Sequence, residues 1–433
     1  MGNPDRYYVE RMTALGESTE VLASEDIRSS MGLKLLKEGA RIDRRVLHRL
    51  LQHKLLRPID YSVLVENAVN RDTLIAEGLT LMGDGSEVSL LLNLSRPQSF
   101  VRQCFARTVL NIAMQNKLTV AYRQRPELFA HSLRVALVAR VIGEQLRLDA
   151  EELDVLATAG LFHDIGELHC DPAIFAPSGP MDAEQHRHIR THPVTGYLIV
   201  KEMQNYQPLI SRAVFEHHER LDGSGYPKGV HDRELSRPGK ILSLVEFAVG
   251  LAQKNTLDDL HTALKLSAGK FDRDAVGALT ALLRARQHRG AMRSDSREVR
   301  NTLGTLNRIL SDWPKVGKNG SSASEEAART FIAANVDILQ RSLVRAGLPP
   351  DGAPEGLDLF GDDPTVFQEI DSVLREALYQ IRQTIRETAL RWPEFLPTAA
   401  AAPPAGLSAW LTETERRLTA PPAGAGISSA EPS

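Results

Sequence analysis

Apolar residues recur at helical spacing through most of the chain. Between about residues 100 and 285 the spacing is typical of buried or amphipathic helices, and residues 271–285 form one such stripe. Another stripe consists of Leu133, Leu137, Val138, Val141 and Ile142. No run alternates with period two for long enough to indicate a large sheet. The pattern therefore predicts a mainly α protein.

The N-terminal part departs from this pattern and predicts a small mixed α+β unit over residues 26–60. Glu38-Gly39 lies between two short extended runs within residues 32–42, which predicts a β-hairpin. Asp43 is a candidate N-cap for the helix that follows, and residues 60–66 resemble a closing strand. The unit is either a sensory or partner-binding module or a packing domain, and the sequence does not decide between them.

Two long helices are predicted near the C-terminus, over residues 324–347 and 364–392. Ser324 precedes two glutamates at the start of the first helix, and Gly347 is a stop signal. The second helix has a continuous apolar stripe that needs a partner surface, either the preceding helix or another subunit. The stripe occupies positions 367, 370, 373, 374, 377, 378, 381 and 385.

These patterns divide the chain into four segments. Residues 1–100 form the small α+β domain, residues 101–287 the main helical domain, and residues 288–395 a helical C-terminal region. Residues 396–433 are rich in Ala and Pro and predict a disordered tail, apart from a short helix at 407–418. A regulatory role for the first segment and a protein partner or homodimer through either end are left open.

Composition limits the classes of partner. The 433 residues include 52 Lys and Arg against 55 Asp and Glu, so the formal net charge is −3. Overall charge thus gives no reason to expect DNA wrapping or adhesion to an anionic membrane. Two cysteines, Cys104 and Cys170, suit a reducing compartment. With no signal-peptide pattern and no apolar run of about 18–20 residues, we expect a soluble, cytoplasmic protein.

Histidine is concentrated in the main helical domain. Nine of the 13 histidines lie between residues 131 and 231. The clusters that stand out are His131, His163-Asp164, His192, His217-His218 and the acidic position Glu246. One histidine in an apolar helix is usually a satisfied core residue, but burying this many ionisable groups is costly unless they are paired or bind metal.

Imidazole and carboxylate ligands together suit Fe, Mn, Zn or Ni. Six or seven of them are too many for a single ion with open positions, so two ions are the natural number, as in centres that hydrolyse phosphate esters. Directly after His217-His218, the loop of residues 219–230 contains Asp222-Gly223-Ser224-Gly225-Tyr226-Pro227. Its two glycines allow positive φ and close approach of a ligand.

The motifs His163-Asp164-Ile165-Gly166 and His217-His218-Glu219-Arg220, with the Gly-Tyr-Pro loop, resemble those of the HD-GYP family of metal-dependent phosphohydrolases. The resemblance covers about residues 105–285. It implies an all-helical HD-type domain with two or three Fe or Mn ions. It also implies hydrolysis of cyclic di-GMP, or of the hybrid cyclic GMP-AMP, to a linear dinucleotide or to mononucleotides.

The resemblance also implies roles for individual residues. Asp164 would bridge two metals and, with His163, form the catalytic core, where a bridging hydroxide would attack phosphorus. The remaining metal ligands would be His131 and Glu246 at one ion and His192, His217 and His218 at the other. Substrate-binding residues would be Arg220, Asp222, Gly223, Gly225, Tyr226, Pro227 and Lys228. Glu127 is either a third-metal ligand or an exposed glutamate at the start of a helix.

Three positions depart from the family pattern. Glu167 replaces a lysine that contacts a substrate phosphate, which should weaken phosphate binding. Glu246 replaces an aspartate but keeps the carboxylate. Residues 248–259 lack the family's basic Arg-Pro-Tyr stretch.

We therefore weigh three hypotheses. The first is a metal-dependent cyclic di-GMP phosphodiesterase. The alternative is a catalytically degenerate HD-GYP domain that acts as a metal- or nucleotide-binding receptor or as a protein-interaction module. The third is a phosphohydrolase for another nucleotide, such as a nucleoside phosphate or alarmone.

Overall fold

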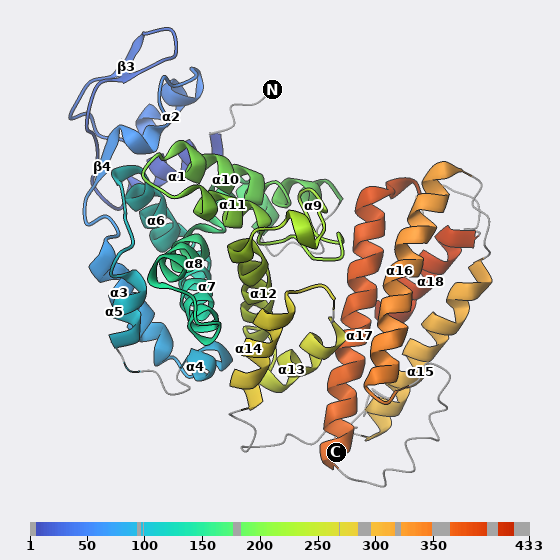
Figure 1. Ribbon diagram of the computed structural model, residues 1–433. Coiled ribbons are helices and arrows are strands. Elements are labelled where there is room, and N and C mark those ends of the chain that lie inside the picture. Colours follow the sequence, from blue (N-terminus) through green and yellow to red (C-terminus); the bar gives the residue numbers. More distant parts are fainter. Residues whose placement is uncertain are drawn as a thin grey trace, which may run out of the picture. The chain divides into compact units, whose positions relative to one another are not determined.

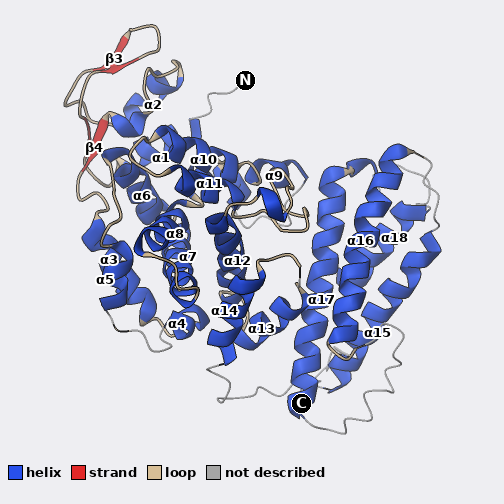
Figure 2. Cartoon of the chain, in the orientation of Figure 1, coloured by secondary structure: helices blue, strands red, loops and turns tan. Residues whose placement is uncertain are grey.

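The computed structural model describes residues 6–92, 97, 99–175, 183–267, 269–284, 296–316, 322–348, 364–395 and 406–419. Helices dominate, and the few strands lie near the N-terminus, which confirms the mainly α prediction (Figures 1 and 2). The chain forms two compact units. Unit 1 comprises Met1–Asn255 and Gly269–Arg286, and unit 2 comprises Thr256–Ala268 and Gln287–Ser433. No described helix is long and apolar enough to cross a bilayer.

The N-terminal part of unit 1 contains two small antiparallel sheets. The strands are β1 (Val21–Ala23), β2 (Ile27–Arg28), β3 (Lys34–Leu36) and β4 (Val63–Val65). β1 pairs with β4, the predicted closing strand, and β2 pairs with β3. The predicted hairpin within residues 32–42 is therefore wrong. Gly39 does form a turn, with φ +74°. The residues on its two sides do not pair with each other, because β3 pairs with the preceding strand β2 and Arg41 forms a β-bridge with Leu22.

The helix predicted after Asp43 is α2 (Arg44–Leu51). The Asp43 carboxylate accepts a hydrogen bond from the Arg45 amide, so the N-cap prediction is confirmed. Capping by a short polar side chain satisfies one of the amides that a helix start leaves unpaired.

Unit 1 otherwise consists of helices and short 3-10 turns. The helices are α1 (Arg6–Leu15), α3 (Arg71–Met82), α4 (Glu87–Leu92), α5 (Ser99–Phe105), α6 (Ile112–Gln124), α7 (Pro126–Gln145), α8 (Ala150–Phe162), α9 (Ala183–Ile189), α10 (His192–Glu202), α11 (Pro208–Glu216), α12 (Arg237–Ala252) and α14 (Arg273–Arg284). The turns are η1 (Ile59–Tyr61), η2 (Ile165–His169), η3 (Pro172–Phe175) and η4 (Asp232–Glu234).

The helix pair α7 and α8 forms the centre of unit 1. Asp149 and Glu152 cap the start of α8 reciprocally, each side chain accepting from the other residue's amide. A side chain at Gly160 would place its Cβ 2.8 Å from the Cα of Ala136, so α8 crosses α7 closely there. This packing fixes the C-terminal end of α8, where His163 and Asp164 follow.

Unit 2 is a bundle of helices. They are α13 (Leu257–Leu266), α15 (Ser296–Asp312), α16 (Ala323–Arg345), α17 (Pro364–Arg391) and α18 (Gly406–Thr419), with the short turns η5 (Trp313–Val316) and η7 (Pro393–Phe395). The two predicted long helices are α16 and α17, with the N-cap of α16 at Ser322 rather than Ser324. The apolar stripe of α17 packs on α13, α15 and α16, so its partner surface lies within the unit.

Two further findings in unit 2 go beyond the sequence expectations. Helix α15 was not predicted, although Val299, Leu303 and Leu306 have helical spacing and are buried. Within the tail, α18 contains the short helix expected there, and Trp410 and Leu411 pack into the core of the bundle. Residues 406–419 are therefore ordered by burial of apolar side chains, and the rest of the predicted tail, residues 396–405 and 420–433, lies outside the described residues.

Candidate metal centre

Helix ends deliver most of the histidines singled out by the sequence. His163 is the C-cap of α8, His192 is the first residue of α10, and His217 is the C-cap of α11. His131 and Glu246 lie inside α7 and α12. Five segments that are far apart in the sequence thus converge in unit 1.

Close backbone packing brings η2 against α10. A Cβ at Gly166 would lie 2.1 Å from the carbonyl oxygen of His192 and 2.8 Å from the Gly196 nitrogen, so no other residue fits there without a shift. The glycine of the His-Asp-Ile-Gly motif therefore sets the distance between Asp164 and His192.

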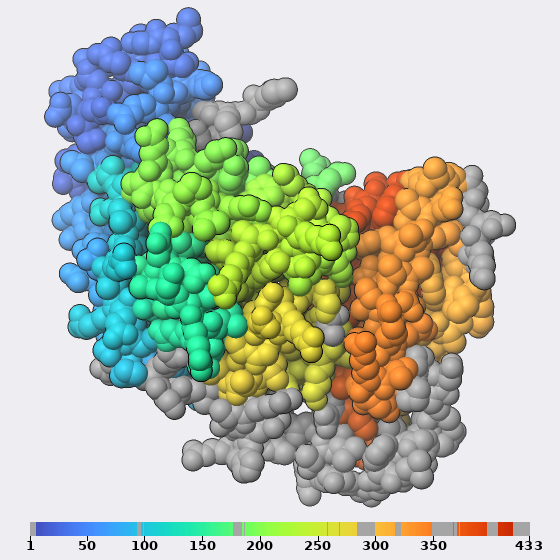
Figure 3. All heavy atoms as spheres, viewed as in Figure 1, coloured from blue at the N-terminus to red at the C-terminus, as the bar shows by residue number. Residues whose placement is uncertain are grey.

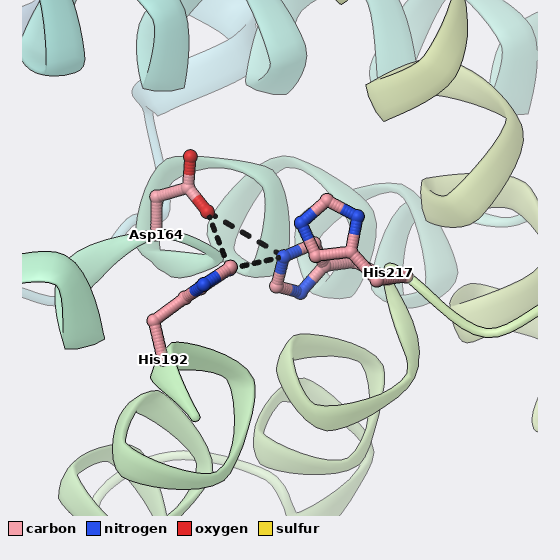
Figure 4. A group of neighbouring side chains, drawn as sticks. Asp164, His192 and His217 are labelled. Carbon is pink, nitrogen blue, oxygen red and sulfur yellow. Dashed lines mark hydrogen bonds and ion pairs between the residues drawn. The ribbon is translucent and has the colours of Figure 1, made fainter. Parts of the chain in front are cut away.

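Asp164 lies at the centre of the first donor group. Its Oδ1 is 3.1 Å from Nε2 of His192 and 3.4 Å from Nε2 of His217, and these two nitrogens are 3.1 Å apart (Figure 4). With His218 added, the donor atoms all lie within 4.8 Å of one another. The group combines one carboxylate with three imidazoles.

The second donor group shares Asp164. Its Oδ2 is 3.0 Å from Nε2 of His163, and donor atoms of His131, His163 and Asp164 also lie within 4.8 Å of one another. Oε2 of Glu246 is 2.9 Å from Nε2 of His131 and 3.2 Å from Nε2 of His163. The longer glutamate arm thus reaches the same group.

Three of the imidazoles are oriented by their own helices. Nδ1 of His163, His192 and His217 lies 2.6–2.8 Å from the carbonyl oxygen three residues earlier. A carbonyl can only accept, so each Nδ1 carries the proton and each Nε2 presents its lone pair to the centre. This is the arrangement by which metal-ligating histidines are usually fixed.

His131 is held in the same way by a side chain. Its Nδ1 lies 2.9 Å from Oε1 of Gln253, which follows Glu246 by two helical turns at the end of α12. The sequence analysis did not single out Gln253, although the i, i+7 spacing places it on the same helix face as Glu246.

Burial and mutual contact shift the pKa values at the centre in opposite directions. Burial disfavours charge on His163, but the carboxylates of Asp164 and Glu246 raise its pKa well above the ordinary value. Burial opposes ionisation of Asp164 too, yet His163 holds its pKa well below the usual range. Burial and neighbouring imidazoles lower the pKa of His217 to about 4 and that of His218 well below the ordinary value.

The residues present fit a pair of divalent ions. Nε2 of His163 and Oδ1 of Asp164 are buried, and although other donor atoms of the centre lie 3.0–3.4 Å away, neither atom forms a well-formed hydrogen bond among the described residues. Buried polar atoms are rarely left in that state without an ion, water or ligand. Neutral imidazole and carboxylate suit Fe, Mn, Zn or Ni, and they do not distinguish among these ions.

Glu167 and Glu127 both contact Arg125, which lies between α6 and α7. Oε2 of Glu167 is 3.2 Å from the guanidinium of Arg125, and Glu127 binds the same guanidinium from the solvent side, with its side chain 66% exposed. Burial and the charge of Asp164 raise the pKa of Glu167 to about 7. Glu127 belongs to neither donor group. Its position agrees with the second of its two predicted roles, that of an exposed glutamate at the start of a helix.

Helix α1 braces the segment that carries Glu167. Nε of Arg11 donates to the carbonyl of Leu168 at 3.2 Å, and the ring of Tyr8 stacks on His169 with centroids 4.9 Å apart. Lys117 on α6 lies 3.2 Å from His169 and 3.3 Å from the buried carboxylate of Asp60. The N-terminal part of unit 1 is thus packed directly on η2.

The Gly-Tyr-Pro loop is built around Glu219, a residue to which the sequence analysis gave no role. This fully buried carboxylate accepts hydrogen bonds from the amides of Lys228, Gly229 and Val230. A Cβ at Gly225 would lie 2.4 Å from the Cα of Glu219, so the loop requires glycine there. Its position directly after His217-His218 was the available signal.

Tyr226 is the loop residue that lies against the donor groups. Its ring stacks on the ring of His218, with centroids 4.6 Å apart. The guanidinium of Arg190 lies 4.3 Å from the centroid of the Tyr226 ring. The Tyr226-Pro227 peptide bond is cis. Tyr226 therefore forms one wall beside the centre.

The other predicted substrate-binding residues have partners of their own. Arg220 donates to Ser243 and to the carbonyl of Glu219, and Asp222 accepts from Ser224. Nζ of Lys228 lies 5.5 Å from the ring centroid of Phe215. Gly223 has φ +77° and packs on His231.

Comparison with known proteins adds a family to this geometry. Residues 112–268 match the family model described as HD domain. Over 161 residues the chain is 29% identical to the 3'3'-cGAMP-specific phosphodiesterase 1 of Vibrio cholerae, and this match covers 37% of each protein. It is 33% identical over 122 residues to the 3'3'-cGAMP-specific phosphodiesterase 3 of the same organism, covering 28% of this chain and 26% of that protein.

A third relative is the cyclic di-GMP phosphodiesterase response regulator RpfG of Xanthomonas campestris, with 25% identity over 201 residues. The match covers 45% of this chain and 51% of that protein. The chain thus spans between about a quarter and a half of the length of these relatives. Residues 112–268, which the HD-domain model matches, include both donor groups, and together with the relatives this match supports an HD-GYP family domain, which confirms the resemblance.

Proposed function

We propose that this protein is a metal-dependent phosphodiesterase that hydrolyses a cyclic dinucleotide, cyclic di-GMP or cyclic GMP-AMP, to a linear dinucleotide or mononucleotides. The observation that carries the proposal is the Asp164 carboxylate, whose two oxygens face two separate groups of imidazoles. A carboxylate shared in this way is suited to hold two ions a short distance apart. The HD-domain model covers residues 112–268, which include every donor residue, and this chain is 25–29% identical to relatives named for cyclic dinucleotide hydrolysis.

The two donor groups supply the proposed ligands. One ion would be held by His131, His163 and Glu246. The other ion would be held by His192, His217 and His218, and Asp164 would contact both ions. When bound, two divalent ions supply a nucleophilic water of lowered pKa and neutralise charge on the phosphate. Gln253 and the backbone carbonyls behind the imidazoles keep the ligand nitrogens aimed at the centre.

The loop after His218 is proposed to position the substrate. The Tyr226 ring stacks on His218, and the Arg190 guanidinium lies over the same ring at 4.3 Å from its centroid. This arrangement places a cation beside the centre, and guanidinium groups bind phosphate oxygens, so Arg190 is proposed to contact a substrate phosphate. The same proposal covers the other residues of this loop to which the resemblance assigned substrate binding, namely Arg220, Asp222, Gly223, Gly225, Pro227 and Lys228.

Domain boundaries follow the same proposal. Residues 101–287 would form the catalytic domain, apart from Thr256–Ala268, which belongs to unit 2. Residues 1–100 would form a regulatory domain packed on it, and residues 288–395 a helical extension. The contact between α1 and η2 supports a regulatory route, because it ends on the segment that follows Asp164 directly.

One observation favours the receptor function as a second candidate. Glu167 places a carboxylate beside Asp164, where the family has a lysine for the phosphate, and its partner Arg125 is already shared with Glu127. A domain of this kind would bind metal or nucleotide without turnover.

The deciding experiment is turnover by the full chain purified without oxygen and loaded with Fe(II) or Mn(II). We expect pGpG or GMP from cyclic di-GMP, or the corresponding products from cyclic GMP-AMP, and loss of product after chelation. Metal content of about two ions per chain without product from either substrate would support the receptor function. Hydrolysis of a nucleoside phosphate or alarmone alone would support the third hypothesis.

A further inference from the structure

Positive charge is concentrated on one part of unit 1. Residues 25–57 contain nine Lys and Arg against four Asp and Glu, a net charge of +5 in a chain whose total is −3. All nine cations are exposed. They are Arg28, Lys34, Lys37, Arg41, Arg44, Arg45, Arg49, Lys54 and Arg57.

Three large apolar side chains are exposed among these cations. Met31 is 93% exposed, Leu56 58% and Leu33 55%. We call the surface formed by residues 28–57 the basic tip; its exposed apolar side chains lie on two segments, residues 28–34 and residues 54–57. Figure 1 shows β3 and α2 together at one end of unit 1, and Figure 3 shows the same segment in dark blue.

Backbone hydrogen bonds hold the two segments of the basic tip side by side. The Ser29 amide donates to the carbonyl of Leu33, which closes the turn that carries Met31. The Ser30 amide donates to Lys54, and the Leu56 amide donates to Arg28, each at 2.8–2.9 Å. Apolar and cationic side chains are therefore mixed on one small surface of fixed backbone.

Part of the charge has no internal counter-ion. Arg28 and Lys34 pair with Asp26, and Arg57 pairs with Glu25. Among the described residues, no carboxylate lies within ion-pair distance of Lys37, Arg44 or Lys54. These cations are available to an external anion.

We propose that the basic tip docks unit 1 on an anionic lipid surface, with Met31, Leu33 and Leu56 entering the interface and the surrounding cations contacting lipid headgroups. Interfacial binding of this kind combines buried apolar side chains with attraction to anionic lipids. Lys and Arg suit the boundary because their apolar stems can lie in the interface while their charged ends reach the headgroups. The near-neutral total charge of the chain conceals this local surface.

The composition of the tip argues against two other kinds of partner, a single-stranded nucleic acid and a protein. Residues 25–57 contain no Phe, Tyr or Trp, the side chains on which single-stranded nucleic acids stack. Three isolated apolar side chains form a smaller apolar core than a stable protein interface of about 800 Å² per partner needs. A lipid surface requires neither.

The test is sedimentation of the full chain with vesicles. Vesicles of phosphatidylcholine with about 30% phosphatidylserine should carry the protein down, whereas phosphatidylcholine alone should not, and 0.5 M salt should release most of it. No binding to the anionic vesicles would overturn the proposal. Binding to RNA homopolymer with none to vesicles would also overturn it.

Two variants and a control locate the surface. Met31→Ser/Leu33→Ser/Leu56→Ser and Lys37→Glu/Arg44→Glu/Lys54→Glu should each reduce the vesicle partition coefficient at least tenfold. The control Arg102→Glu/Arg123→Glu/Lys201→Glu makes the same charge change at exposed positions of unit 1 outside the tip and should reduce it less than threefold. Equal losses in the charge variant and the control would overturn the assignment to the tip. Circular dichroism and metal content check that each variant is folded.

Discussion

Around Leu374 in unit 2 the buried side chains are nearly all apolar, whereas around Asp164 in unit 1 they are ionisable. The core of unit 2 joins five helices through Leu, Ile, Val and Phe side chains. The centre of unit 1 buries His163, Asp164, His192 and His217 in direct contact with one another. The two units therefore use burial for different ends.

The difference identifies which unit bears the chemistry. Apolar burial stabilises a fold wherever it occurs, so the bundle of unit 2 needs no ligand to account for it. Burial of several ionisable groups opposes folding unless their charges are compensated. Such a cluster fits a bound group that compensates its charges, and its nitrogen and oxygen donors are those that suit a metal ion.

The largest expected effect comes from removing the carboxylate shared by the two donor groups. Asp164→Ala should lower turnover by roughly a thousandfold or more and reduce metal content, because both proposed ions lose a ligand. Turnover and metal per chain, measured on the same preparation, check this. Asp171→Ala removes a carboxylate seven residues away, outside both donor groups, and should retain metal. Full metal content in Asp164→Ala would contradict the two-ion assignment.

The corresponding change in unit 2 should affect stability alone. Leu374 is fully buried, so Leu374→Ala should lower the free energy of unfolding by about 2–5 kcal/mol. All three tryptophans, Trp313, Trp392 and Trp410, lie in unit 2, so urea unfolding followed by tryptophan fluorescence reports on this unit. Metal content should be unchanged. A loss of metal in this variant would show that the two units are not independent.

Glu167 tests how far charge beside the centre limits the reaction. Glu167→Lys replaces a carboxyl whose pKa is raised to about 7 with a cation next to the proposed phosphate site, and it should raise kcat/KM about tenfold. It also removes one of the two carboxylate partners of Arg125 and should lower the midpoint of thermal unfolding. Glu167→Gln, which removes the charge without adding one, should give an intermediate kcat/KM. Identical kinetics in all three proteins would place this side chain away from the substrate.

The smallest effect is expected for an exposed ion pair of unit 2. Arg341 and Asp337 are one helical turn apart on α16 and largely exposed. Arg341→Ala should change the free energy of unfolding by no more than about 0.5 kcal/mol, because solvent screens such pairs. The same fluorescence measurement applies. A loss above about 1 kcal/mol would mean that this surface is covered in solution.

Much of the helical architecture could be predicted from the sequence. The spacing of apolar residues that predicts α7, α16 and α17 involves residues within a few turns of one another, and so does the helix cap at Asp43. Local pattern is therefore sufficient to predict them. The pairing of β3 with β2 was missed because two short extended runs beside a turn carry no information about a third partner.

The candidate site was predicted in its chemistry but not in its surroundings. The ligand types and their order along the chain were legible because adjacent ionisable residues in apolar helices are unusual. Arg125 was missed as the partner of Glu167, since 42 positions separate them and nothing local links the two. Glu219 was part of a quoted motif, yet its hydrogen bonds to three loop amides depend on the fold of that loop.

The sequence by itself determined the mainly α class, many of the helices and the set of imidazoles and carboxylates, because periodicity and residue type are local properties. Only the tertiary structure decided that Asp164 faces both donor groups, that Arg125 pairs with Glu167, and that the cations of residues 25–57 surround exposed apolar side chains. Contacts of this kind join residues far apart in the chain, and packing of whole helices and strands, not local preference, sets their distances.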